Sequence, residues 1–332
     1  MSRRVNRLKI IWLFVGGLAA GLLVGVILRF MQPKPGLPVN TPAIVSEKIY
    51  FKSDKGLEGL ADGEESYPDI KSMIEANYLR YLKKAYVLMG SYPGCELIKI
   101  SANVERNDID WENDFYCDPG EIYYRRHRGE ESIGKIGIDV SEFQGNIDWE
   151  KVKAAGIEVA IIRIGYRGYG KSGTIKLDSK AYSYLRGAQE VGIATGVYFF
   201  SSAINREEGI EEAQFVLDSI SGYNITEPVI IDTERVFEDE SARANNISVE
   251  ERTDAVKGFC ETIEAAGYTP MIYASRDQFV RYLNVDIIGN WEFWYCSYDN
   301  TSFPYHTEGY QYSRKGYVDG ISTEVDMDVW MR

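Results

Sequence analysis

From residue 134 onward, short apolar runs alternate with segments of helical periodicity, and this alternation limits the possible fold more than any other feature. It is typical of βα units, whose strands assemble into a parallel sheet or a closed barrel. Eight strands are predicted, at 136–140, 159–164, 194–200, 228–232, 269–273, 293–297, 309–312 and 325–330. Four helices are predicted between them, at 149–155, 178–191, 206–220 and 248–266.

The last of these helices has the clearest boundaries. Ser248 is followed three residues later by Glu251, which forms a capping box, and Gly267 stands beyond the C-terminal end. The connections after the sixth strand are too short for full helices. We therefore expect an α/β fold over residues 131–332, a TIM-like (β/α) barrel that is irregular in its second half.

The N-terminal segment indicates on which side of a membrane the barrel lies. Residues 10–28 carry no charge, and as a helix this stretch would be about 28 Å long, enough to cross a bilayer. The alternative is a cleavable signal peptide, but the run ends in Leu28-Arg29-Phe30-Met31 rather than in small residues. The sequence therefore favours one transmembrane helix within residues 1–31. Basic residues precede it and favour a cytoplasmic N-terminus with an extracytoplasmic barrel: Arg3, Arg4, Arg7 and Lys9.

Small residues recur along this apolar run. Gly17, Gly21 and Gly25 stand four residues apart and would lie on one face of the helix. Such a stripe lets two membrane helices approach closely, so it predicts a weak homodimer. The alternative is that these glycines have no pairing role, since glycine is common in membrane helices.

Between the predicted membrane helix and the barrel lie a Pro-rich linker, residues 32–44, and a small α+β or irregular region, residues 45–130. The spacing of apolar residues predicts a helix over Pro68–Met89, which Gly90 would end. The sequence assigns no function to this region.

The four cysteines fall into two pairs. Outside the membrane a disulfide between Cys95 and Cys117 is expected, with two free thiols as the alternative. Cys260 and Cys296 fall in a predicted helix and a predicted strand, so we expect them to be buried thiols.

Charge and composition exclude several functions. The formal net charge of -13 argues against a nucleic-acid partner, because phosphate backbones select basic surfaces. His127 and His306 are the only histidines, which argues against a His-based triad or a multi-His metal site. The sequence implies no metal and no organic cofactor.

Four carboxylic acids fall where a barrel carries its chemistry, and we expect all four at the C-terminal ends of strands. Asp139 ends the first strand, Asp232 and Glu234 end the fourth, and Asp326 lies in the eighth. Because a strand has a period of two, Asp232 and Glu234 point to the same side. The first and eighth strands of a closed barrel are neighbours, so Asp139 and Asp326 should face this pair across the mouth. The alternative is that these acids are ordinary helix caps and loop residues.

Such a group of acids suits glycoside hydrolysis. The leaving oxygen needs a proton at neutral pH, while the developing oxocarbenium charge needs a nearby anion. Crowding several carboxylates raises the pKa of one of them, which stays protonated as the acid while others remain ionised.

Several separate motifs support this interpretation. They are Gly137-Ile-Asp-Val-Ser-x-x-Gln-Gly145 with Ile147-Asp-Trp149, Ile161-Ile-Arg-Ile-Gly-Tyr166, Gly196-Val-Tyr-Phe-Phe200, Asp232-x-Glu234, and the ending Tyr310-Gln-Tyr-Ser313, Val318-Asp-Gly-Ile-Ser322 and Val325-Asp326. With these motifs, residues 136–332 resemble the glycoside hydrolase family 25 lysozymes, the Chalaropsis-type N-acetylmuramidases.

The resemblance implies cleavage of the β-1,4 bond between N-acetylmuramic acid and N-acetylglucosamine in peptidoglycan glycan strands, with net retention. By position, Glu234 would be the general acid, and Asp139 and Asp326 would line the floor of the cleft. Asp232 would stabilise the intermediate, either as nucleophile or by assisting the N-acetyl group of the substrate. Residues 1–130 lie outside the resemblance.

Aromatic residues near predicted strand ends are candidates for sugar stacking. Tyr166, Tyr198 and Trp294 would present ring faces to a substrate there, with ordinary barrel packing as the alternative. The run Glu238-Asp-Glu240 continues the negative charge after the acid pair and leaves the preferred form of peptidoglycan open.

Two other functions are alternatives to glycoside hydrolysis. Residues 165–172 match the Walker A pattern of P-loop nucleotide-binding proteins, but helical periodicity starts only near Asp178, and such a loop needs a helix directly after it. A non-catalytic wall-binding module on the same fold is the other alternative. The presence of all four acids argues against it.

Overall fold

The structure is a computed structural model that describes residues 49–50, 85–90, 96–111, 113–117, 123–298 and 303–332. The predicted membrane helix, its glycine stripe, the Pro-rich linker, residues 68–84 of the predicted helix and Cys95 lie outside these ranges. Within the described ranges, no helix combines the length and apolarity needed to cross a bilayer. The proposed domain boundaries therefore stay predictions.

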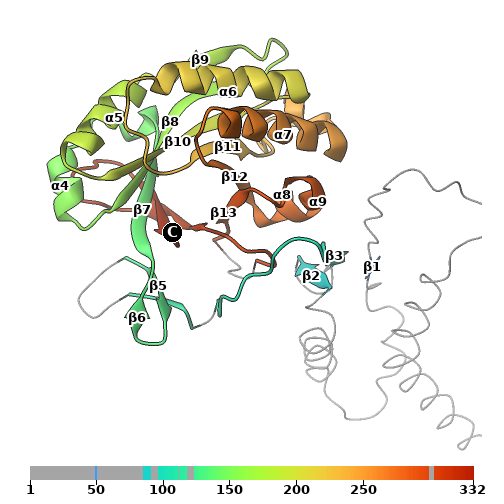
Figure 1. The fold of residues 1–332 in the computed structure, drawn as a ribbon, viewed down its shortest axis with the longest axis horizontal. Helices are drawn as coiled ribbons and strands as arrows, with labels where there is room; N and C mark the ends of the chain where they lie inside the picture. Colours follow the sequence, from blue (N-terminus) through green and yellow to red (C-terminus); the bar gives the residue numbers. More distant parts are fainter. Residues whose placement is uncertain (1–48, 51–84, 91–95, 112, 118–122, 299–302) are drawn as a thin grey trace, which may run out of the picture. The chain divides into compact units, whose positions relative to one another are not determined.

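Eight strands close into a barrel (Figure 1), as the sequence predicted. Each strand pairs with the next along the ring, and the last pairs with the first. All neighbours run parallel except at β15, which is antiparallel to both β14 and β7. In chain order the barrel strands are β7 (Lys135–Val140), β8 (Val159–Arg167), β10 (Ala194–Ser201), β11 (Val229–Thr233), β12 (Pro270–Ser275), β13 (Glu292–Cys296), β14 (Gly309–Gly316) and β15 (Val325–Trp330).

The helices cover the outside of the strands in the first half of the barrel (Figure 1). Two short helices follow β12, and no helix occurs among the described residues after β13, which confirms the predicted irregular second half. The helices are α4 (Trp149–Ala154), α5 (Ala181–Glu190), α6 (Arg206–Ile220), α7 (Val249–Ala265), α8 (Arg276–Arg281) and α9 (Val285–Ile288), with 3-10 turns η5 (Glu142–Gln144) and η6 (Arg243–Asn246).

Alternate residues of the strands build two separate layers of core. One layer lies between strands and helices, and the other fills the inside of the barrel, where Trp294 and Trp330 pack with ring centroids 5.4 Å apart. Gly137 and Gly309 leave room for Trp330, because a Cβ at either position would come within 2.6 Å of its ring. The interior layer consists of Val159, Ile161, Ile230, Met271, Tyr273, Trp294, Cys296 and Trp330.

The local signals at α7 and at two cysteines are confirmed. Ser248 caps α7, and its reciprocal hydrogen bonds with Glu251 form the predicted capping box. Cys260 and Cys296 are buried free thiols. The pairing of Cys117 stays a prediction, because Cys95 lies outside the described residues.

The part before the barrel forms two small antiparallel sheets. Residues Tyr86–Met89 are a strand, β2, so the end of the helix predicted over Pro68–Met89 is wrong. Alternate side chains of β2 are buried, and Val87 and Met89 join the core that lies outside the barrel strands. The pairing of β2 with β3 and the burial of alternate side chains therefore favour a strand here, although the apolar spacing fits a helix. The sheets consist of β1 (Ile49–Tyr50), β3 (Glu96–Lys99) and β2, and of β4 (Phe115–Tyr116), β5 (Arg125–Arg128) and β6 (Glu131–Ser132).

The Walker A-like segment is a β-hairpin. Strand β8 continues through Arg167, and β9 (Ile175–Leu177) returns antiparallel to it. Helix α5 begins only at Ala181. Without a helix at the end of the loop, its amides cannot converge on a phosphate as in a P-loop. The hairpin therefore argues against nucleotide binding.

Candidate active site

A cleft of about 810 Å³ opens at the barrel mouth and is lined by all four predicted acids. Asp232 lies in β11 and Glu234 follows on the same side, as the period of the strand requires. Asp139 lies in β7 directly opposite Asp326 in β15. The structure thus brings together the four acids that the sequence selected.

One detail of that prediction is wrong. Asp326 is the second residue of β15 and does not lie at the C-terminal end of a strand. It reaches the mouth because β15 runs antiparallel to β7, so that the start of β15 lies beside the end of β7. A shortened barrel without a final crossover helix permits this reversal.

Asp232 and Glu234 each affect the pKa of the other's carboxyl. Burial raises the pKa of Glu234 to about 7, and the charge of Asp326 acts in the same direction, against a hydrogen bond with Asp232. Burial and the charge of Glu234 also raise the pKa of Asp232, which Arg163 opposes. The pair therefore holds a proton at neutral pH, as a general acid must.

Asp139 accepts a hydrogen bond from Gln311 of β14, which in turn contacts two tyrosines. Gln311 Nε2 donates to Asp139 Oδ2 at 2.7 Å, while Gln311 Oε1 accepts from the hydroxyls of Tyr273 and Tyr298 at 2.9 and 2.6 Å. Burial, with the charges of Asp326 and Asp328, raises the pKa of Asp139 well above its ordinary range. Burial raises that of Asp326 to about 6.

Arg163 brings positive charge to the cleft. Its Nε donates to Asp178 Oδ2 at 2.7 Å, and its guanidinium lies 5.0 Å from the centroid of the exposed Phe143 ring. Both Arg163 and Phe143 line the cleft. The motif around Arg163 was recognised in the sequence, but the residue itself was not selected. A charge inside an apolar strand signals a buried partner, and that signal was available.

Two of the three predicted aromatic residues line the cleft. Tyr198 and Trp294 line the cleft, with ring centroids 6.5 Å apart. Trp294 is only 1% exposed and donates from Nε1 to Asp328 Oδ1 at 3.0 Å, so it forms the floor. Tyr166 is not among the cleft-lining residues. Its ring centroid lies 5.3 Å from the guanidinium carbon of the cleft residue Arg163, and the register of β8 and β10 pairs it with Phe200, which lines the cleft. Its role in sugar stacking therefore stays a prediction.

Further residues line the cleft besides the predicted acids and aromatic rings. Phe237 and Tyr169 are 79% and 48% exposed, and Arg314 and Glu238 also line the cleft. Among the described residues, no group of three or more His, Cys, Asp or Glu side chains is arranged to hold a metal ion.

A closed barrel with crowded carboxyls at its mouth defines a class, the barrel glycoside hydrolases. The chain belongs to glycosyl hydrolases family 25, whose sequence model matches residues 138–321, more than half of its length.

Two lysozymes and one solved structure illustrate what the chain is similar to. The autolytic lysozyme of Clostridium acetobutylicum is 25% identical over 194 residues, which cover 58% of this chain and 54% of that protein. Lysozyme M1 of Streptomyces globisporus is 26% identical over 212 residues, or 59% and 67%. The modular autolysin LytC of Streptococcus pneumoniae, solved with a synthetic peptidoglycan ligand, shares the fold with a TM-score of 0.55 and 23% identity, over 74% of this chain and 56% of that one. The chain thus spans about half of the autolytic lysozyme and of LytC.

Proposed function

We propose that this glycoside hydrolase cleaves the β-1,4 bond between N-acetylmuramic acid and N-acetylglucosamine in peptidoglycan. The observation that carries the proposal is the proton-holding pair Asp232 and Glu234 in a cleft that Asp139 and Asp326 also line. Family membership and the lysozyme names of two relatives support it. A wall-binding module without catalysis would have no use for such a pair.

In this proposal each acid has a role. Glu234 donates its proton to the leaving oxygen, because its raised pKa keeps it protonated near neutral pH. Asp232 stabilises the intermediate from the neighbouring position. Asp139 and Asp326 shape the floor of the cleft. Asp326, whose pKa burial raises to about 6, is largely ionised at neutral pH and adds negative charge that favours an oxocarbenium-like transition state.

Product analysis tests this function. Full-length protein in mild detergent should release glycan fragments from purified peptidoglycan whose new reducing ends are N-acetylmuramic acid, with the β-configuration at the moment of cleavage. New reducing ends on N-acetylglucosamine would instead indicate a glucosaminidase. Binding of the polymer without any new reducing ends would point to the wall-binding module.

We also propose that residues 10–28 are retained as a single membrane span, with the N-terminus cytoplasmic and the barrel outside. The uncharged run and the basic residues before it support this topology, and so does a substrate that lies outside the membrane. The glycine stripe supports at most weak pairing of two such helices.

Fractionation and protease accessibility test the topology. The protein should stay in the membrane fraction during carbonate extraction, and protease added to wall-free cells should release the barrel. Recovery of protein that begins after residue 31 from the medium would show a cleaved signal peptide. A barrel that resists protease added to intact, wall-free cells would contradict this orientation.

A further inference from the structure

Two exposed aromatic rings at the cleft belong to loops rather than to the barrel strands. Tyr169 lies in the hairpin between β8 and β9, and Phe237 lies three residues after Glu234. They are 48% and 79% exposed. A ring on a loop stacks on a sugar only where something holds the loop, since ordering it at binding would cost conformational entropy.

The loop that carries Phe237 is held by Asn245 of η6. Asn245 Oδ1 accepts from Val236 N at 2.9 Å, and Asn245 Nδ2 donates to Val236 O and Asp239 O at 2.7 and 3.0 Å. These contacts enclose Phe237 on both sides along the chain. The position of η6 therefore sets the position of the Phe237 loop.

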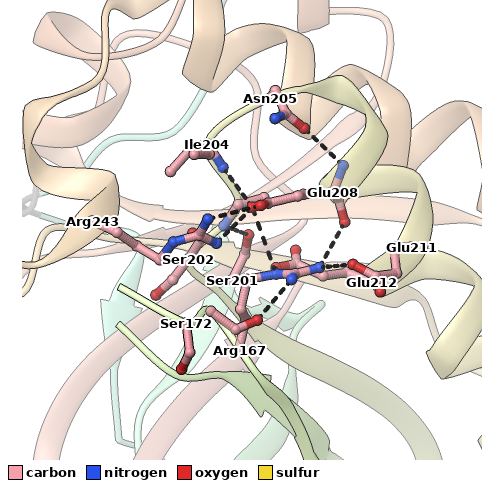
Figure 2. Close-up of polar contacts among 12 residues, drawn as sticks. Arg167, Ser172, Ser201, Ser202, Ile204, Asn205, Glu208, Glu211, Glu212 and Arg243 are labelled. Atoms are coloured by element: carbon pink, nitrogen blue, oxygen red, sulfur yellow. Dashed lines mark hydrogen bonds and ion pairs between the residues drawn. The ribbon is translucent and has the colours of Figure 1, made fainter. Parts of the chain in front are cut away.

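The η6 turn is in turn anchored on helix α6 through Arg243, as Figure 2 shows. Its guanidinium makes two parallel hydrogen bonds to Glu208, from Nη1 to Oε2 at 2.6 Å and from Nη2 to Oε1 at 2.7 Å. Bidentate contacts of this kind fix orientation as well as distance. The two side chains are 12% and 21% exposed, so water screens them little.

The same anchor reaches the Tyr169 hairpin. Arg243 N donates to Tyr169 O at 2.9 Å, and the guanidinium packs against Gly173, where a Cβ would collide with it. Arg167 ties the hairpin to α6 a second time, since its Nε donates to Glu212 Oε1 at 2.7 Å (Figure 2). Its Nη1 donates to Gly173 O of the hairpin at 2.8 Å. Both aromatic loops thus depend on one buried group of charges.

We propose that the ion pair of Arg243 with Glu208 is a positioning device that holds Tyr169 and Phe237 ready to stack on the glycan, so that it sets glycan affinity rather than the rate of bond cleavage. We call this pair the rim clamp. The proposal rests on the proposed glycan hydrolase function. Neither clamp residue lines the cleft, so the rim clamp acts through the two rings.

Steady-state kinetics with solubilised peptidoglycan test the rim clamp in the full-length protein. Arg243→Gln and Glu208→Gln should each raise KM roughly five- to tenfold, the size expected for losing aromatic contacts, while kcat stays within about twofold. The Kd for an N-acetylglucosamine tetramer, measured in the Glu234→Gln background to prevent cleavage, should rise by a similar factor. Arg243→Lys keeps the charge but loses the bidentate contact and should give a smaller rise.

The decisive measurement is coupling with the rings. In a Tyr169→Ala, Phe237→Ala background, Arg243→Gln should change KM by less than about twofold, because the clamp then has nothing to position. A general loss of stability would instead act equally in both backgrounds.

A matched control lies on the same helix. Arg206, the first residue of α6, forms an exposed ion pair with Glu261 of α7. Arg206→Gln removes the same type of charge and should leave KM unchanged. An unchanged KM in a folded Arg243→Gln or Arg243→Lys variant would overturn the rim clamp, as would an equal rise with and without the rings. A wild-type protein that cleaves no peptidoglycan would instead overturn the proposed function.

Discussion

Glu234→Gln is expected to reduce cleavage of peptidoglycan by roughly 10²- to 10⁴-fold, the usual contribution of a general acid. The amide keeps the shape of the carboxyl but has no proton to give to the leaving oxygen. Burial raises the pKa of Glu234 to about 7, so the wild-type side chain still carries that proton near neutral pH. Initial rates of reducing-end release measure the loss. Thermal melting should show a variant at least as stable as wild type, because it no longer buries a titrating carboxyl.

The pH dependence of the rate tests whether this loss of activity comes from the missing proton of Glu234. Since Glu234 must be protonated to act, kcat/KM of the wild type should fall as pH rises through about 7. The residual activity of Glu234→Gln should lack this limb. The exposed Glu238, whose charge also raises the pKa of Glu234, provides the control. Glu238→Gln should keep activity within about threefold and move the limb slightly to lower pH. A Glu234→Gln rate above about half of wild type would refute the assignment.

Much of the barrel could be predicted because buried strands and amphipathic helices leave different periods in a sequence. Helix α6 was predicted with its observed bounds, and the ends of α7 followed from Ser248 and Gly267. The strand Tyr86–Met89 could not be separated from a helix by apolar spacing, because its pairing with Glu96–Lys99 is a tertiary contact. The direction of β15 was missed for the same reason.

In the candidate site, too, residues with a local sequence pattern could be predicted, whereas residues that depend on long-range contacts could not. Asp232 and Glu234 could be found because their spacing of two puts both on one face of one strand. Gln311 could not be found in this way, since its role depends on a hydrogen bond to Asp139, which lies 172 residues away in sequence. The loop residues of the cleft are harder still. The loop that carries Phe237 is held by hydrogen bonds of Val236 and Asp239 with Asn245, and no periodicity encodes such contacts.

The position of Asp232 bears on how the intermediate is stabilised. Burial and the charge of Glu234 raise the pKa of its carboxyl, and its Oδ1 is buried with no hydrogen-bond partner among the described residues. A nucleophile in a retaining enzyme stands about 5 Å from the acid carboxyl, on the other side of the scissile bond. Asp232 and Glu234 instead stand two residues apart on one face of one strand end, so their carboxyls lie on the same side of the cleft. We therefore propose that Asp232 orients the N-acetyl group of the substrate. The carbonyl oxygen of this group bonds to the anomeric carbon as the bond to the leaving oxygen, protonated by Glu234, breaks, and Asp232 stabilises the positive charge that develops.

Asp232→Asn should then lower kcat by roughly 10²- to 10³-fold, the loss typical of one buried group that stabilises charge in the transition state, with KM nearly unchanged. Wild-type enzyme should also fail to cleave peptidoglycan from which the N-acetyl groups have been removed, because the internal nucleophile is then absent. Re-acetylation of the same polymer controls for damage and should restore cleavage. The nucleophile alternative makes the opposite prediction. It expects cleavage of the de-N-acetylated polymer and a glycosyl ester on Asp232, which mass spectrometry of the peptide that contains it would detect.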